Sequence, residues 1–132
     1  MLETIHPPHW PKPVGYANAI AATGKQIYIG GQIGWNAECR FETDDLVEQI
    51  KQTLTNIVTV LAAAGGESAH IASMTWYLTD LGAYAAHLRP IGQVYREVIG
   101  RHFPAMAVVG VTTLVEPRAQ VEIQVIAVLP DA

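Results

Sequence analysis

The segment from about Ala105 to Leu114 restricts the fold more than any other part of the sequence. Its residues alternate as in a strand, yet both faces are apolar: Met106, Val108 and Leu114 on one, and Ala107, Val109 and Val111 on the other. A strand that is apolar on both faces needs cover on both sides of its sheet. Two helical segments can cover only one side, so the sequence predicts that the other side packs against further copies of the chain.

Four more segments show the apolar alternation and the turn signals of strands. They are residues 18–23 and 26–33, joined by a turn at 23–25, and residues 70–79 and 120–129. Gly30 and Gly31 are unusual inside a strand. Glycine there commonly marks a bulge, or a place where a ligand or another backbone comes close.

Two segments have the periodicity of amphipathic helices. The first begins after Thr43, which we expect to cap it, and ends at Gly65-Gly66. Its apolar residues recur every three or four positions: Leu46, Ile50, Leu54, Ile57 and Leu61. The second spans residues 82–100, and Pro90 predicts a kink or a restart within it.

The proline-rich start, residues 1–13, indicates an extended arm, because each proline pushes the preceding residue out of the helical region. The order of the elements is then β-β-α-β-α-β-β. This order predicts an α+β sandwich, and the length of 132 residues predicts that residues 1–132 form a single domain.

Composition narrows the class of protein. The chain is 50% hydrophobic and 15% charged, so it has ample apolar material to bury and is not of the disordered class. Its net charge of −4 and sequence pI of about 5.6 disfavour nucleic-acid binding, which depends on clustered positive charge. The mean hydropathy of +0.20 is high for so small a chain and favours a homo-oligomer.

The sequence predicts neither disulfides nor a metal or other cofactor. Cys39 is the single cysteine, and the prolines between His6 and His9 prevent the two imidazoles from sharing a helical face. The first 13 residues lack a basic stretch followed by an apolar run, and no segment has about 18 consecutive apolar residues. We therefore expect a cytoplasmic protein without a membrane partner.

Several stretches together resemble the YjgF/RidA family, over about Pro13 to Val128. They are GYANAIAATGKQIYIGGQIGWN, the helix ending AAAGG, YLTDLGAY, HFPAMAVVGVTTL and VEIQVIAV. The resemblance implies a chorismate-mutase-like fold, assembled as a homotrimer with three sheets forming a barrel-like core and the helices outside. It also implies a small-molecule cleft at each subunit interface. The best-understood activity of the family is hydrolysis of reactive enamines and imines to a keto acid and ammonia, and other members deaminate products such as 2-aminomuconate.

Transfer of the family's site residues to this chain preserves only part of the cleft. The resemblance implies that Glu122 is the catalytic carboxylate that positions water, and that Tyr16 and Gly31 line the cleft. The other matched positions carry different residues: Met106 replaces the arginine that holds the substrate carboxylate, and Ala107, Val108, Gly30 and Gly92 replace Ser, Cys, Ser and Asn. About four extra residues around His87 to Ile91 lie beside the expected cleft.

Each of these residues also has a plainer interpretation. Glu122 could be a solvated strand carboxylate, Tyr16 and Met106 could be packing residues, and Trp35 could wall the cleft or pack at an interface. Arg89, Arg118 or an arginine of another copy could replace the missing cation. On this resemblance, an arginine at position 106 would face Glu122 across the cleft.

Three classes of function remain open on the sequence alone. The leading one is hydrolysis of an enamine or imine larger than 2-aminoacrylate, because methionine cannot bind a small 2-imino acid as arginine does. The second is non-catalytic binding of a metabolite or regulation of a partner. The third, a ribonuclease or translation inhibitor, is disfavoured by the net charge of −4.

Overall fold

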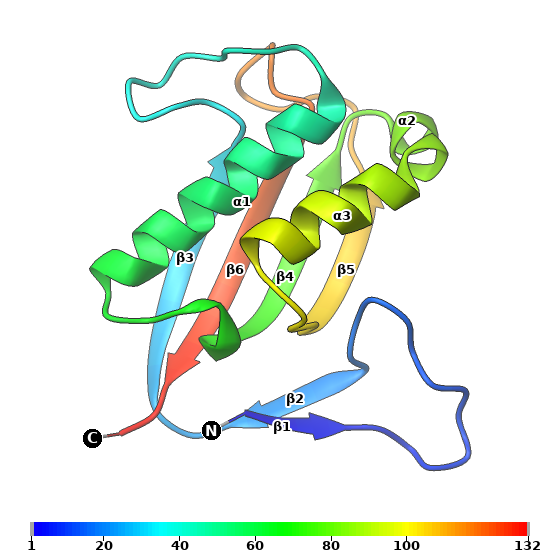
Figure 1. The fold of residues 1–132 in the computed structure, drawn as a ribbon, viewed down its shortest axis with the longest axis vertical. Coiled ribbons are helices and arrows are strands. Elements are labelled where there is room, and N and C mark those ends of the chain that lie inside the picture. Colours follow the sequence, from blue (N-terminus) through cyan, green and yellow to red (C-terminus); the bar gives the residue numbers. More distant parts are fainter. Residues whose placement is uncertain (1, 132) are drawn as a thin grey trace.

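Two sheets and two long helices organise the chain in the computed structural model, which describes residues 2–131 (Figure 1). The elements in order are β1 Leu2–Ile5, β2 Ala19–Ala22, β3 Lys25–Ile33, α1 Leu46–Ala63, the 3-10 turn η1 Ser68–His70, β4 Ile71–Leu78, α2 Leu81–Ala86, α3 Leu88–Val98, β5 Ala105–Gly110 and β6 Val121–Leu129. The main sheet has the order β3-β6-β4-β5, in which only the β4–β5 pair is parallel. β5 is therefore an edge strand.

Both long helices cover the same face of this sheet. Figure 1 shows α1 in front of β3 and β6, and α3 in front of β4 and β5. The core forms between these layers: Ile50, Leu54, Ile57 and Leu61 of α1 are fully buried, as are Leu78 of β4 and Val121 and Ile123 of β6. This arrangement confirms the predicted α+β fold with helices on one side.

The opposite face of the sheet is not covered by the helices. Tyr28 of β3 is 70% exposed and Val109 of β5 is 39% exposed on that side. Glu122 and Gln124 of β6 also project from it, because they alternate with the buried residues of the same strand. We call this side the uncovered face.

Helix α1 is bounded by local signals. Its N-cap is Asp45, whose side chain accepts a hydrogen bond from Glu48 N at 3.0 Å, so the prediction that Thr43 caps the helix is wrong. Thr43 instead accepts from Asp45 N and holds the cap residue in place. At the other end, Gly65 N donates to Ala62 O and Gly66 N donates to Leu61 O, with Gly65 at φ +84. This is the Schellman arrangement that glycine favours.

Three other predicted elements have different boundaries. The strand expected over 105–114 ends at Gly110, because its neighbour β4 ends at Leu78 and offers no further partner. The helix expected over 82–100 is two helices that meet at His87. Pro90 lies in the first turn of α3, where its missing N–H has no helical acceptor to lose, so the restart precedes the proline.

The N-terminal arm contains a strand that the sequence did not reveal. Residues 2–5 form β1, which pairs antiparallel with β2, within the 1–13 segment expected to be extended. The predicted strands 18–23 and 26–33 therefore belong to different sheets, since β2 pairs with β1 and β3 pairs with β6. Pairing of this kind depends on distant partners, which periodicity cannot identify.

Candidate ligand-binding site

A cavity of about 910 Å³ lies between helices α2 and α3 and the helix-facing side of β4 and β5. The segment 12–16 of the N-terminal arm also lines it. The lining residues are Lys12, Pro13, Val14, Gly15, Tyr16, Trp76, Tyr84, Leu88, Ile91, Gly92, Tyr95, Arg96, Phe103, Met106 and Val108. Its volume and largely apolar walls are those of a small-molecule site.

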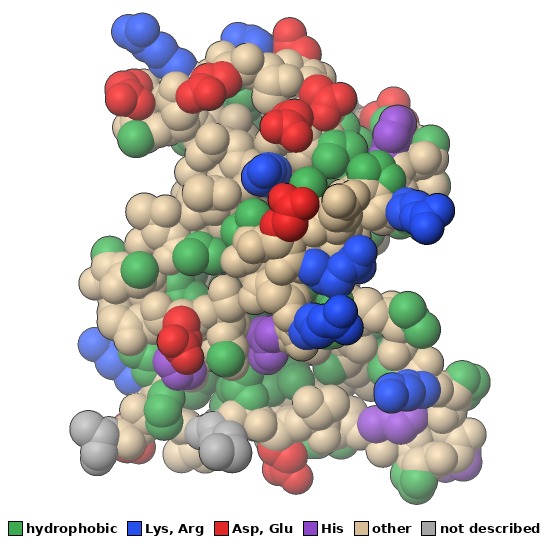
Figure 2. Space-filling view, in the orientation of Figure 1, with side chains coloured by type: hydrophobic (Ala, Val, Ile, Leu, Met, Phe, Trp, Pro, Cys, Tyr) green, Lys and Arg blue, Asp and Glu red, His purple; other side chains and the backbone are tan. Residues whose placement is uncertain are grey.

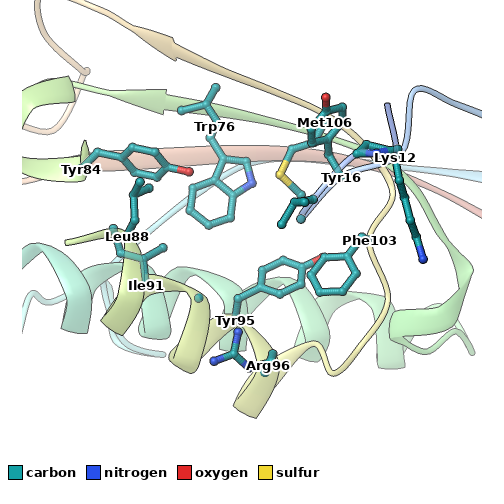
Figure 3. Close-up of a pocket in the computed structure, with 15 residues that line it drawn as sticks. Lys12, Tyr16, Trp76, Tyr84, Leu88, Ile91, Tyr95, Arg96, Phe103 and Met106 are labelled. Carbon is teal, nitrogen blue, oxygen red and sulfur yellow. The ribbon is translucent and has the colours of Figure 1, made fainter. Parts of the chain in front are cut away.

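Of the five aromatic side chains that line the cavity, four pack against one another (Figure 3). Trp76 is packed edge-on to Tyr84, with ring centroids 6.2 Å apart and an interplanar angle of 73°. Tyr95 stacks on Phe103 with centroids 5.5 Å apart, and lies 6.5 Å from Trp76. Figure 3 shows Tyr84 and Trp76 on one side of the space and Tyr95 and Phe103 on the other. The rings form walls against which a flat apolar group can pack.

Burial raises the pKa of both Tyr84 and Tyr95 above the ordinary tyrosine value, at which the hydroxyl is already neutral at physiological pH. The Tyr95 hydroxyl donates to the carbonyl of His102 at 2.6 Å. The ring of His102 in turn lies 2.7 Å from Ile71 O through Nε2. Tyr95 is thereby fixed as a structural wall, with its hydroxyl already used.

The indole N–H of Trp76 has no such partner. Trp76 is 2% exposed, and its Nε1 is the one buried side-chain polar atom of residues 2–131 that lacks a hydrogen bond. Figure 3 shows the indole nitrogen turned toward the part of the cavity where Met106 lies. A buried donor without an acceptor is costly and rare, so this atom is a candidate contact for a ligand.

The arm reaches the cavity through an attachment to the edge strand. Ala17 N donates to Pro104 O at 3.0 Å, and Ala17 forms a parallel bridge with Ala105 at the start of β5. This attachment holds the preceding residue, Tyr16, at the cavity wall, where 44% of its surface remains exposed.

The structure gathers four of the predicted site residues at this cavity: Tyr16, Gly92, Met106 and Val108. Leu88 and Ile91, from the segment with the predicted insertion, line it too. Ala107 alternates with Met106 and Val108 on β5, so it projects from the uncovered face instead. Trp35 lies in the loop after β3, with its ring 6.0 Å from that of Phe41, and does not line the cavity.

Glu122, Gly30 and Gly31 lie together away from the cavity. The β3–β6 register shifts between Ile29 and Gln32, which is the bulge that the two glycines predicted. The Glu122 carboxylate rests on Gly31 so closely that a Cβ at position 31 would collide with it, whereas a Cβ at Gly30 would meet nothing. Glycine at 31 is thus required for the present position of the carboxylate.

Glu122 and the cavity occupy opposite faces of one sheet. Met106 faces the helices and Glu122 projects from the uncovered face. Within one chain the two positions therefore lie apart, and the expectation that an arginine at 106 would face Glu122 across an interface cleft stays a prediction about two copies. The two groups can meet only if they come from different copies.

Sequence reasoning missed the cations and the two aromatic residues that matter most at the cavity. Lys12 and Arg96 line it, as do Trp76 and Tyr84. Arg118, one of the predicted replacements, is instead bound to Asp44 at 2.9 Å and does not line the cavity. Arg89, the other, is exposed on α3 and is also absent from the lining. Gly92 and Arg96 are four residues apart, so a helix brings them to the same face, and this spacing could have indicated that Arg96 lies beside the predicted site residue Gly92.

The described residues also bear on metal binding and on membrane crossing. Among residues 2–131, no three His, Cys, Asp or Glu side chains come together as a metal-binding group. Both ring nitrogens of His6 are engaged, with Trp10 O at 3.0 Å and with Asn18 at 3.1 Å. None of the described helices is both long and apolar enough for a membrane crossing.

The mixed sheet, the helices on one face and the edge-strand cavity define an α+β protein of the chorismate-mutase-like YjgF fold. The family profile described as Endoribonuclease L-PSP matches residues 9–129. The chain belongs to this family, which is also known as YjgF/RidA or Rid.

Relatives and solved structures agree with this assignment. The chain is 37% identical to Protein DfrA of Myxococcus xanthus, covering 96% of this chain and 95% of the relative. It is 33% identical to a 2-iminobutanoate/2-iminopropanoate deaminase of Capra hircus, covering 89% and 83%. A Rid family protein of unknown function, YyfB from Yersinia pestis, matches with a TM-score of 0.87 at 28% identity, covering 97% and 98%. RidA from an Antarctic Psychrobacter matches with a TM-score of 0.70 at 29% identity, covering 96% and 99%.

Proposed function

We propose that this protein hydrolyses an enamine or imine to a carbonyl compound and ammonia, at a site completed between two copies of a homotrimer. The position of Glu122 carries this proposal. Its carboxylate lies over a glycine bulge on the uncovered face, where another copy can pack, and the cavity opens beside the edge strand β5. Relatives named 2-iminobutanoate/2-iminopropanoate deaminases support the reaction class.

The chemistry requires one water and one proton acceptor. Glu122 of one copy takes a proton from water as the oxygen attacks the C=N carbon of a substrate held in the cavity of another copy. Glu122 passes this proton to the nitrogen, which gives a neutral carbinolamine. The carbinolamine hydroxyl then gives its proton to the nitrogen through Glu122, the C–N bond breaks, and ammonia leaves as the C=O bond forms. One imine and one water thus give one carbonyl compound and one ammonia.

The cavity favours a substrate larger than a two- or three-carbon imino acid. Its aromatic and aliphatic walls enclose about 910 Å³, and methionine stands at position 106 in place of a cation. A small, strongly charged substrate would leave most of this apolar space empty. We therefore expect poor turnover of 2-aminoacrylate.

The test is ammonia release from imines that an amino-acid oxidase generates in the assay. We expect wild-type protein to accelerate ammonia release, and Glu122→Gln to lower the rate about 100-fold or more, as for loss of a general base. Glu116→Gln is the matched control, because this half-buried carboxylate lies in the loop between β5 and β6 and is not among the atoms nearest a Cβ at Gly31. Equal rates for wild type and Glu122→Gln would refute the proposal.

One observation favours non-catalytic binding as a second candidate. None of the described residues that line the cavity carries a carboxylate, so a single chain can bind a ligand there without a base. Tight binding of keto acids or imines by wild-type protein, with ammonia release no faster than in buffer, would favour this function instead.

A further inference from the structure

Arg96 stands where a bound anion would reach it, although neither the family pattern nor any sequence motif selects it. It lines the cavity from α3, four residues after Gly92. A Cβ built on Gly92 would lie 3.3 Å from the Arg96 Nη1, so the guanidinium lies along the helix over this glycine. The absence of a side chain at position 92 thereby opens the space that the guanidinium occupies at the cavity wall.

Arg96 also lacks an acidic partner. In the part of the chain that the structure describes, the ion pairs are Lys51 with Glu97 and Arg118 with Asp44. Figure 2 shows several Lys and Arg side chains over and beside α3, with others at the top and the lower left, and the acidic side chains most frequent toward the top of the view. The chain is acidic as a whole, yet the charged residues among those that line the cavity are the cations Lys12 and Arg96.

Lys12 is the other cation at the cavity, and it is the weaker candidate. It is exposed on the irregular arm, whereas Arg96 is held on a helix whose inner face is buried. A guanidinium also presents a planar pair of donors that matches both oxygens of a carboxylate, which an ammonium does not. The arrangement therefore favours Arg96 as the carboxylate partner.

The remaining walls indicate what is attached to that carboxylate. Trp76, Tyr84 and Phe103 offer ring faces and edges at the spacings of aromatic packing. The unpartnered Trp76 N–H adds one buried donor, which requires an acceptor atom on the ligand. A ligand with an aromatic ring and a polar acceptor next to its carboxylate satisfies all three kinds of contact.

We infer that Arg96 binds the carboxylate of the substrate, and that the substrate is the imine of a 2-keto acid with an aromatic or similarly large apolar side chain. This inference rests on the proposed function for the reaction, but its binding test does not require turnover. Arg96 lines the cavity from α3, whereas Met106 lines it from β5.

Calorimetric titration with three ligands tests the assignment. Phenylpyruvate has the ring and the carboxylate, pyruvate lacks the ring, and benzyl methyl ketone lacks the carboxylate. We expect wild-type protein to bind phenylpyruvate at least about tenfold more tightly than pyruvate. Arg96→Gln should weaken phenylpyruvate binding about 10- to 100-fold, as for loss of a hydrogen-bonded charge, and leave benzyl methyl ketone binding unchanged.

Matched variants control for the loss of a surface charge. Arg89→Gln removes an exposed arginine of the same helix that does not line the cavity, and it should bind phenylpyruvate as wild type does. Arg96→Lys should keep part of the affinity, because it retains the charge without the planar fork. All of these variants change exposed side chains, so unchanged circular dichroism and elution volume are expected.

Different results would overturn the assignment of Arg96 and the proposed substrate class. Arg96→Gln binding phenylpyruvate like wild type, or Lys12→Gln showing the large loss instead, would overturn the assignment of Arg96. Equal affinity of wild type for pyruvate and phenylpyruvate, or binding of neither, would overturn the substrate class. None of these results alters the dependence of ammonia release on Glu122, which judges the proposed function separately.

Discussion

Gln49 and Trp76 show how differently two buried polar residues can be used. Gln49 is fully buried in α1, and its amide donates to Thr43 O at 3.1 Å and to Arg118 O at 3.0 Å while accepting from Gln120 N at 2.9 Å. Trp76 is almost as buried and its N–H meets nothing. A saturated polar group ties the fold together, whereas an unsatisfied one in a cavity wall is available to a ligand.

Gln49→Leu keeps the approximate volume of the side chain but leaves two carbonyls and one N–H without partners. We expect the free energy of unfolding to fall by about 2–4 kcal/mol, the range for buried polar groups that lose their hydrogen bonds. Urea denaturation followed by circular dichroism measures it. Gln52→Leu on the same helix is the control, since Gln52 bonds only to Asn56 among the described side chains and should cost far less.

At the scale of elements, the sequence predicted those helices and strands whose determining residues lie within the same segment, and it missed pairings with distant segments. Helix α1 was predictable because its apolar stripe and its terminal glycines act within the segment itself. The bulge in β3 was predictable from Gly30-Gly31 for the same reason. The pairing of β1 with β2 was not, because either strand is short and its partner lies far along the chain.

Some residues of the candidate site could likewise be predicted from the sequence and others could not. The resemblance selected Tyr16, Gly92, Met106 and Val108, which the structure brings to one cavity. It could not select Arg96, because this residue lies outside the stretches that carry the resemblance.

The bulge in β3 offers a test with neighbouring residues. Gly31→Ala places a Cβ in the space of the Glu122 carboxylate, whereas the Cβ of Gly30→Ala meets no atom within 4 Å. We expect Gly31→Ala to lower ammonia release about tenfold or more by displacing the carboxylate. Gly30→Ala should retain activity, and steady-state kinetics of the two variants compare them. Similar activity in both would mean that the position of Glu122 does not matter.

At the scale of the whole molecule, the main feature is the uncovered face of the sheet, against which we expect other copies of the chain to pack. Light scattering should give three times the chain mass of 14.3 kDa for the proposed homotrimer. Val109→Asp puts a charge on the uncovered face, where Val109 is 39% exposed, and should yield monomers that no longer release ammonia. Val115→Asp changes a loop residue that is 93% exposed and should leave the mass unchanged. Monomeric wild-type protein at micromolar concentration would contradict the homotrimer.

The separation of Glu122 and the cavity on opposite faces of one sheet has a genetic consequence. If each site draws its base and its binding walls from different copies, two inactive variants can complement one another. Glu122→Gln lacks the base, and Gly92→Leu fills the cavity at a position where only the flexible end of Arg96 is near. Refolding equal amounts of both together should restore about one site in four, because random assembly joins an intact cavity to an intact carboxylate that often. A cell carrying one copy of each allele would then keep part of the activity that neither allele supplies alone.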